Sequence, residues 1–123
     1  MKFIKSNLDP VIIVINEVEY PAKLTFRALA ELEEITETTF MRLFSKMEGS
    51  NLTAEELIKM TYVSLKAGGL DITLDDLFDN DFNVKSTNNM MTQIGKLLTR
   101  TMKVVSILES EEAVDGDDDK KKM

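Results

Sequence analysis

At 123 residues, with 43% hydrophobic and 30% charged side chains, the chain has the length and composition of one folded domain and not of a disordered protein. It contains no cysteine and no histidine, which excludes disulfide bonds, thiol nucleophiles, imidazole catalysis and the usual zinc sites. The formal charge of −7 argues against general nucleic-acid binding, because neutralising phosphates needs a surplus of Lys and Arg.

The first ten residues show neither a long apolar run nor a small-residue cleavage site, so they predict no secretory signal. The longest apolar run, Val11–Ile15, is far shorter than the roughly 20 residues that cross a bilayer. We therefore expect a cytoplasmic protein without a membrane partner.

A β-hairpin is predicted near the start of the chain. The five β-branched residues of Val11–Ile15 favour a strand, and the alternating segment Val18–Tyr20 supplies a second strand that ends at Pro21. Between them, Asn16 readily accepts a left-handed backbone, whereas Glu17 does so less readily than the Gly usually found there. The pattern predicts a hairpin but leaves its turn type open.

Helical periodicity begins after Thr25, a suitable N-cap residue, and apolar residues recur at helical spacing from Phe26 to Ile35. The segment ITETT interrupts the pattern, and a second helical stretch follows until the turn residues EGSN end it. Two short helices and one kinked helix fit this pattern equally well.

Two capping boxes predict the starts of the next helices. Thr53 is followed three residues later by Glu56, so each side chain can accept a hydrogen bond from the other's backbone N–H. Thr73 and Asp76 repeat this spacing before a short helix. Gly68–Gly69 supplies the left-handed residue that ends the longer of the two helices.

The longest periodic segment runs from about Ser86 to Ser110 and predicts a helix roughly 37 Å long at about 1.5 Å per residue. Lys96, Arg100 and Lys103 fall on the face opposite its apolar residues. The helix is therefore expected to be amphipathic, with a basic back.

The end of the chain, ESEEAVDGDDDKKKM, carries seven acids, three bases and too few apolar groups to offset the entropy of ordering. By contrast, residues 83–108 carry four bases and no acid. We expect residues 1–110 to form a single domain and residues 111–123 a disordered acidic tail with a short Lys run. The fold class is α+β and mostly α, with the hairpin packed on a bundle of four to five helices.

No residues form a recognisable catalytic or metal-binding motif. The acidic segment DITLDDLFDNDF lacks the central Gly of a calcium loop and places Leu and Phe where such a loop is polar. Gly68–Gly69 lacks the context of a phosphate-binding loop. The basic back has no interleaved aromatic residues, so a solvated or ion-paired helix face explains it better than nucleic-acid binding. We therefore expect a protein that is not an enzyme and that takes no cofactor, no metal and no nucleic acid.

Methionine points to candidate contact residues. The chain has eight Met residues, whose flexible thioethers suit adaptable binding surfaces, although most of them are expected in the core. Met90 and Met91 are adjacent and cannot point the same way, so one of them is expected on an exposed apolar patch. The candidate protein-binding residues are Met90, Met91, Ile94, Leu98 and Met102.

The order of these features resembles the small tail assembly chaperones of long-tailed bacteriophages, especially those that infect Gram-positive hosts. The resemblance covers about residues 10–82, from VIIVINEVEYPAKLTFRALAELEEIT through NLTAEELIKMTYVSLKAGGLDITLDDLFD. The family's hairpin and first-helix pattern is matched in order by Asn16, Tyr20, Phe26, Leu32 and Glu33. The chain departs from the pattern at Glu17, which replaces the usual turn Gly, and at ITETT, which lacks the Gly often found after the first helix.

The resemblance implies a helical, non-enzymatic protein that binds the tape measure protein and keeps it soluble during tail assembly. Such a protein works in the host cytoplasm and is absent from the mature virion. The resemblance also implies contacts with the major tail tube protein and a longer second product made by ribosomal frameshifting near the end of the gene. Lys120–Lys122, which a run of A could encode, is the candidate frameshift site, with a solubilising charged tail as the alternative explanation.

Two other functions stay open. One is a small acidic regulatory or DNA-mimic protein that sequesters a basic host protein. Mimicry needs regularly spaced exposed acids, whereas the acids of this chain gather at predicted helix starts and in the tail. The other is a minor structural protein of the tail.

The apolar strand Val11–Ile15 needs cover on both faces, because a lone two-stranded hairpin is marginal in water. The helices are expected to cover one face, and either Phe3 and Ile4 or a neighbouring subunit the other. We therefore expect a homo-oligomer held by strand pairing or apolar packing at this strand. The candidate self-association residues are Val11, Ile13 and Ile15.

Overall fold

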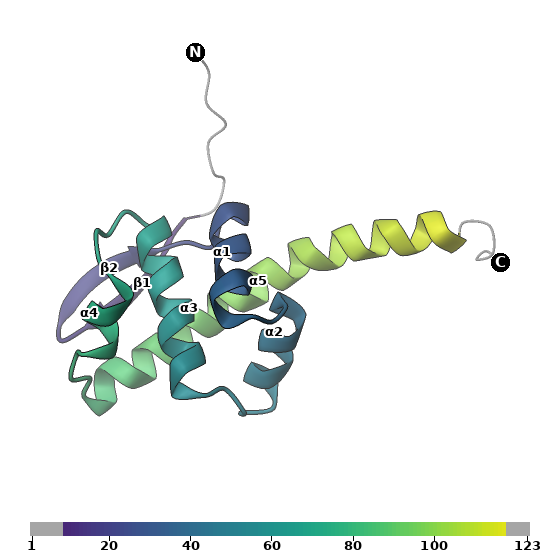
Figure 1. The fold of residues 1–123 in the computed structure, drawn as a ribbon. Helices are drawn as coiled ribbons and strands as arrows, with labels where there is room; N and C mark the ends of the chain where they lie inside the picture. The colour runs from purple at the N-terminus through teal and green to yellow at the C-terminus, as the bar shows by residue number, and fades with distance from the viewer. Residues whose placement is uncertain (1–8, 118–123) are drawn as a thin grey trace, which may run out of the picture.

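The computed structural model describes residues 9–117 of the chain, with side chains described to Ile107. In this part the chain forms one antiparallel hairpin followed by five helices (Figure 1). The elements are β1 (Val11–Ile15), β2 (Val18–Ala22), α1 (Phe26–Thr36), α2 (Phe40–Glu48), α3 (Ala54–Ala67), α4 (Leu74–Phe78) and α5 (Val84–Asp117). The predicted fold class, α+β and mostly α, is confirmed.

A two-residue turn with left-handed backbone at both positions closes the hairpin. The φ angle is 51° at Asn16 and 69° at Glu17, the pattern of a type I′ turn. Ile15 pairs with Val18 directly beside the turn. The predicted hairpin is confirmed, and Glu17 holds a conformation that a glycine would adopt at lower cost.

β2 does not end at Pro21, as predicted, but continues to Ala22. Pro21 lies opposite Ile12 in the register. Proline is tolerated in an edge strand where its missing N–H would point away from the partner strand. The prediction treated proline as a strand end, although in a two-stranded sheet every strand is an edge.

The predicted helix starts are confirmed by their N-cap contacts. The Thr25 hydroxyl accepts a hydrogen bond from the backbone N–H of Ala28 at 3.1 Å. The boxes that begin at Thr53 and Thr73 are both reciprocal, with side chain and backbone bonded in each direction. These contacts satisfy N–H groups that the helix itself leaves without partners.

α1 and α2 are two separate helices, which decides between the alternatives at ITETT. Glu37 ends α1 with a φ of 57°, and Thr39 caps α2. The Glu33 carboxylate accepts a hydrogen bond from the backbone N–H of Phe40 at 2.7 Å, so the end of α1 supports the start of α2.

The end of α3 packs tightly on β2. A Cβ atom built on Gly68 would lie 2.1 Å from the Pro21 carbonyl oxygen, so only glycine fits there. The backbone N–H of Lys23 donates to the Ser64 carbonyl at 3.0 Å. Gly69 has a φ of 109°, which confirms the predicted left-handed helix end.

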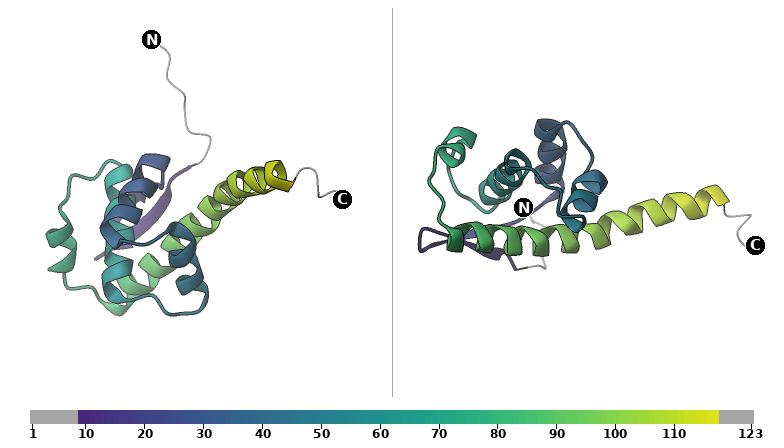
Figure 2. Two further views of the ribbon diagram at one scale, coloured as in Figure 1. Left: turned by 45° about the vertical axis from the view of Figure 1, so that its right-hand side comes forward. Right: turned by 90° about the horizontal axis from the view of Figure 1, so that it is seen from below.

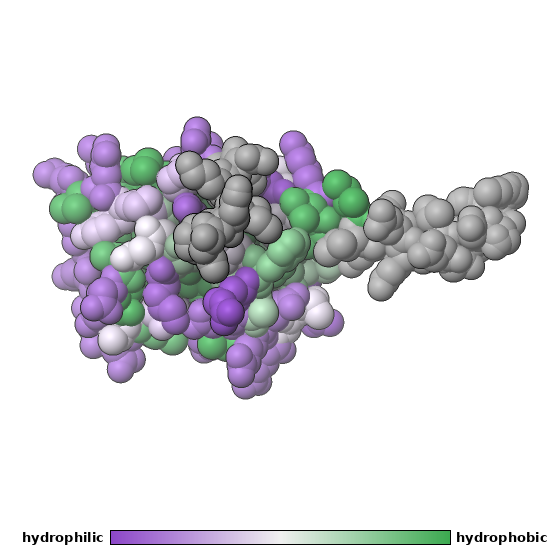
Figure 3. All heavy atoms as spheres, turned by 90° about the horizontal axis from the view of Figure 1, so that it is seen from above, coloured by the Kyte–Doolittle hydropathy of each residue, from purple (hydrophilic) through white to green (hydrophobic). Residues whose placement is uncertain are grey.

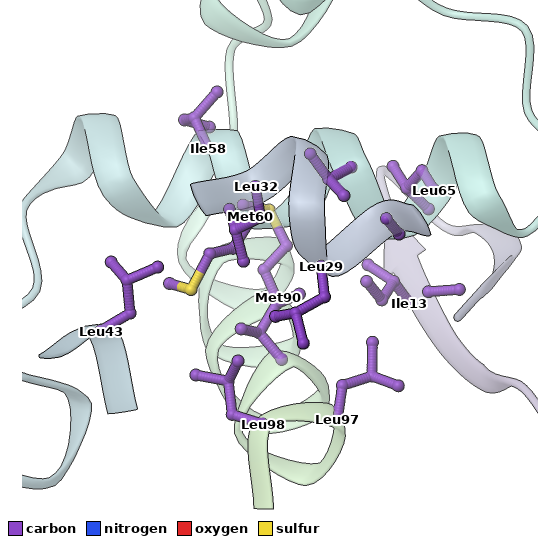
Figure 4. Close-up of a cluster of buried hydrophobic side chains, with 14 of the residues drawn as sticks. Ile13, Leu29, Leu32, Leu43, Ile58, Met60, Leu65, Met90, Leu97 and Leu98 are labelled. Atoms are coloured by element: carbon purple, nitrogen blue, oxygen red, sulfur yellow. The ribbon is translucent and has the colours of Figure 1, made fainter. Parts of the chain in front are cut away.

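The core lies between two layers. The hairpin and α5 form one layer, and the other helices form the second (Figure 2). α5 packs against β1, α2 and α3, while α3 also contacts α1, α4 and β2. Figure 4 shows side chains from these elements converging on one cluster. The largest fully buried side chains are Phe40, Ile13, Leu32, Leu43, Met60, Leu65, Leu77, Met90, Ile94, Leu97, Leu98 and Val63.

α5 is longer than the predicted helix at both ends. It begins at Val84, where the Asn83 carboxamide accepts a hydrogen bond from the Ser86 N–H at 2.7 Å, and it continues to Asp117. The prediction ended the helix near Ser110 because too few apolar groups follow to be buried. A helix, however, forms its backbone hydrogen bonds within its own segment and needs no burial for them. The expected Lys run and the candidate frameshift site at Lys120–Lys122 lie outside the described residues.

The second half of α5 projects from the packed part of the molecule, residues 9–105, which we call the body (Figures 1 and 2). With 34 residues, the helix is roughly 51 Å long at about 1.5 Å per residue. Phe3 and Ile4, predicted as one cover for the hairpin, lie outside the described residues.

Candidate functional site

The five candidate contact residues of α5 do not share one surface. Met90 and Leu98, labelled in Figure 4, belong to the core and are each 1% exposed, as is Ile94, whereas Met91 is 53% exposed and Met102 is partly buried. The expectation that one of the adjacent methionines is exposed is confirmed. Met90, Ile94 and Leu98 follow one another at spacings of four residues, which turns them all toward the elements that α5 packs against, α2, α3 and β1, and leaves them almost no exposed surface for the predicted contact role.

The candidate self-association residues of β1 also face inward. Ile13 is fully buried, Ile15 is 5% exposed and Val11 is partly buried. Side chains alternate between the two faces of a strand, so the more exposed residue is the neighbouring Ile12, at 39%. Val11, Ile13 and Ile15 therefore contribute to this chain's own core, and their role in self-association stays a prediction.

Two polar side chains of α5 cover the free edge of β1. The backbone N–H of Val14 donates to Asn89 Oδ1 at 2.6 Å, and that of Asn16 donates to Ser86 Oγ at 2.9 Å. These N–H groups would otherwise be open to an incoming strand. The contacts oppose strand pairing between subunits at this edge, which was one of the two predicted modes of self-association, the other being apolar packing.

Ser86 and Asn89 were not among the predicted site residues, although the sequence contains one signal for them. Ser86 lies four residues before Met90, in line with the buried face of α5, and it is only 3% exposed. A polar residue in line with a buried face needs a hydrogen-bond partner. Ser86 meets this need by accepting the hydrogen bond from the backbone N–H of Asn16, next to β1.

Exposed apolar side chains lie at two places on α5. Val84 and Met91, 77% and 53% exposed, are seven residues apart and hence on one face near the helix start; we call them the proximal patch. Val104 and Ile107, 40% and 61% exposed, form the distal patch. Figure 3 shows hydrophobic surface where α5 leaves the body.

An open groove of about 530 Å³ follows the basic back of α5 where it passes Val11 and Met47. We call it the basic groove, after its lining residues Lys96, Arg100 and Lys103. Within residues 9–107, none of these three cations forms an ion pair with a carboxylate. Arg100 donates to the Asp9 carbonyl at 3.0 Å, but its Nε is buried without a partner in the described part of the chain.

Five acidic side chains of the body cap a helix or pair with a lysine, namely Glu31, Glu33, Glu55, Glu56 and Asp76. The Lys46 ammonium, 2.6 Å from the Glu56 carboxylate, holds the pKa of that carboxyl below its usual value, and the Thr53 backbone N–H acts in the same direction. The Thr73 backbone N–H similarly lowers the pKa of Asp76. These five acids support the protein's own structure.

The described residues hold no group of three or more His, Cys, Asp or Glu side chains placed to bind a metal ion.

A second groove, of about 490 Å³, lies beside Val14 and Glu17 and is lined mainly by amide and hydroxyl side chains of α5. Among residues 9–117, no helix has both the length and the apolar character needed to cross a membrane.

Comparison with known proteins identifies a family for this chain. A family model described as "Phage tail tube protein, GTA-gp10" matches residues 10–104, from just before β1 to the middle of α5. No curated protein and no solved structure was found to match the chain.

Proposed function

The chain belongs to the phage tail tube protein family, GTA-gp10, and on that premise we propose that it is a tail assembly chaperone that binds the tape measure protein. In this proposal the protein is not an enzyme, acts in the host cytoplasm and is absent from the mature virion. The major tail tube protein is a second proposed partner.

The observation that carries the proposal is the proximal patch of α5. Val84 and Met91 are both exposed and lie about 10 Å apart along the helix axis, at about 1.5 Å per residue. Two apolar side chains two turns apart match the spacing at which amphipathic helices dock against one another. The unbranched thioether of Met91 adapts to clients of varied shape.

The acidity of the chain supports a soluble carrier. Its formal charge is −7, and a net charge of this size keeps a small protein soluble. A long client with apolar helices gains solubility when such a protein covers it. The combination of an exposed apolar patch and an acidic body therefore suits a holding role.

Co-expression with the tape measure protein of the same phage tests the proposal. We expect the intact chain to raise the soluble fraction of the client, and Val84→Glu/Met91→Glu to abolish that gain. Met41→Glu, an exposed methionine on α2, is the matched control and should keep it. A client that is equally insoluble with and without the chain would contradict the proposal.

The name of the family, which refers to the tail tube, favours a second candidate, a structural protein of the tail. Mass spectrometry of purified virions separates the two candidates, because a chaperone should be absent and a structural subunit present in many copies.

A longer frameshift product is a further proposal, and the nucleotides of codons 118–123 test it. An A-run interrupted by G at the Lys codons would rule out slippage there.

A further inference from the structure

We propose that α5 pairs in antiparallel orientation with the α5 of a second copy, so that the acidic residues 109–117 of each chain lie along the basic groove of the other. This pairing goes beyond client binding and uses the distal patch, which lies well apart from the proximal patch along the helix. Three observations carry it: the cations of the groove, the distal patch and the continuity of the helix.

The basic groove carries positively charged side chains on a protein whose net charge is negative. Lys96, Arg100 and Lys103 follow one another at spacings of four and three residues, so they share one face of α5. They have no carboxylate partner among the described side chains. An acidic segment laid along this strip would therefore gain three opposite charges close by.

The distal patch continues the same face beyond the groove. Ile107 follows Lys103 by four residues, which places it in line with the three cations, and it is 61% exposed. Val104 is the neighbouring exposed apolar residue. The helix thus presents a basic segment followed by an apolar one, at the point where it leaves the body.

The third segment in this order is acidic. Residues 109–117 continue α5, and their sequence contains five acids and no base. Because the basic and acidic segments belong to one unbroken helix, a chain cannot fold its own acidic segment back onto its groove. The matching acidic segment has to come from another molecule, and a second copy carries one of the right length.

Antiparallel pairing matches all three segments at once. A register that places Ile107 opposite its counterpart puts residue 111 of one copy opposite Lys103 of the other. The two apolar patches then meet at the centre, with an acidic segment over a basic groove on each side. The arrangement is two-fold symmetric, as closed homodimers usually are. Parallel pairing would instead place basic against basic and acidic against acidic.

Cysteine cross-linking tests the register, because the chain contains no cysteine of its own. Lys103→Cys and Glu111→Cys, made in separate full-length variants, should form a mixed disulfide when combined under mild oxidation. Neither variant should cross-link efficiently with itself, because equal positions are displaced by about 12 Å at about 1.5 Å per residue. Val84→Cys, also exposed but far from the paired region, is the control and should stay uncross-linked.

Sedimentation velocity of the full chain tests the charge pairing. We expect a dimer that weakens with added salt, and at least a tenfold higher dissociation constant in Lys96→Glu/Lys103→Glu and in Glu111→Lys/Asp115→Lys. Mixing these two variants should restore a heterodimer. Arg27→Glu/Arg42→Glu, which reverses two exposed cations elsewhere, should leave the dimer unchanged.

Two results would overturn the pairing. One is a chain that stays monomeric at about 100 µM and low salt, even if it binds an isolated peptide of residues 109–117, because the partner would then be a different acidic protein. The other is a dimer that neither reversal weakens. Both results leave the client-binding experiment untouched, so the two proposals fail separately.

Discussion

The cover of the β1 edge by α5 makes a quantitative prediction about stability. Ser86→Ala/Asn89→Ala removes the acceptors of two backbone N–H groups, those of Asn16 and Val14. Both contacts are only partly buried, so each loss should cost about 1–1.5 kcal/mol, the lower part of the range for a donor left without a partner. Alanine raises helix propensity by about 0.5 kcal/mol per site. The net loss is therefore about 1–2 kcal/mol.

Circular dichroism at 222 nm, followed through thermal and urea unfolding, measures this loss. A loss of this size should lower the Tm by about 5–10 °C in a domain of this length. Asn88→Ala is the matched control, because Asn88 is adjacent and exposed and its substitution gains the same helix propensity without removing a described hydrogen bond to β1. A double variant as stable as Asn88→Ala would refute the view that these side chains hold the strand edge.

Three further predictions concern single positions. Glu17→Gly should raise the free energy of unfolding by about 0.5–1 kcal/mol, because glycine accepts a φ of 69° without strain; an unchanged urea midpoint would contradict this. Gly68→Ala should lower it by about 1–3 kcal/mol through collision with a backbone carbonyl of β2, whereas Gly95→Ala, whose Cβ meets a sulfur at an ordinary 3.7 Å, should be neutral or stabilising in the same melt. Lys46 lowers the pKa of Glu56 in the folded state, so the pair stabilises the fold above the ordinary Glu pKa and this gain is lost as the pH falls through the folded-state value. The stability gap between wild type and Glu56→Gln should accordingly shrink on acidification, and a constant gap from pH 7 to pH 3 would count against the ion pair.

Local signals carried the correct parts of the fold prediction. Thr25, Thr53 and Thr73 begin helices because a hydroxyl at the N-cap bonds a backbone N–H two or three residues on, whatever the rest of the chain does. The hairpin followed from its β-branched run. Its turn type did not follow, because a left-handed Glu17 depends on the pairing of the strands and not on the residue's own preference.

The candidate site was harder to predict, because the contact residues were chosen from the periodic apolar stripe of α5. That periodicity is the mark of a buried face, so Met90 and Ile94 belong to the core. The exposed Val84 and Ile107 are the apolar residues that depart from the stripe, and that departure is visible in the sequence. Ile13 is fully buried as well, so Ile13→Asp should unfold the body.

The contact between Val14 and Asn89 also sets the order in which the molecule can be completed during synthesis. The two residues are 75 positions apart, so β1 leaves the ribosome long before the helix that covers its edge. At about 5–20 residues per second, the strand waits roughly 4 to 15 seconds for α5. The hairpin therefore passes its most aggregation-prone interval while the chain is still being made, and the body can close only after the start of α5 has left the ribosome.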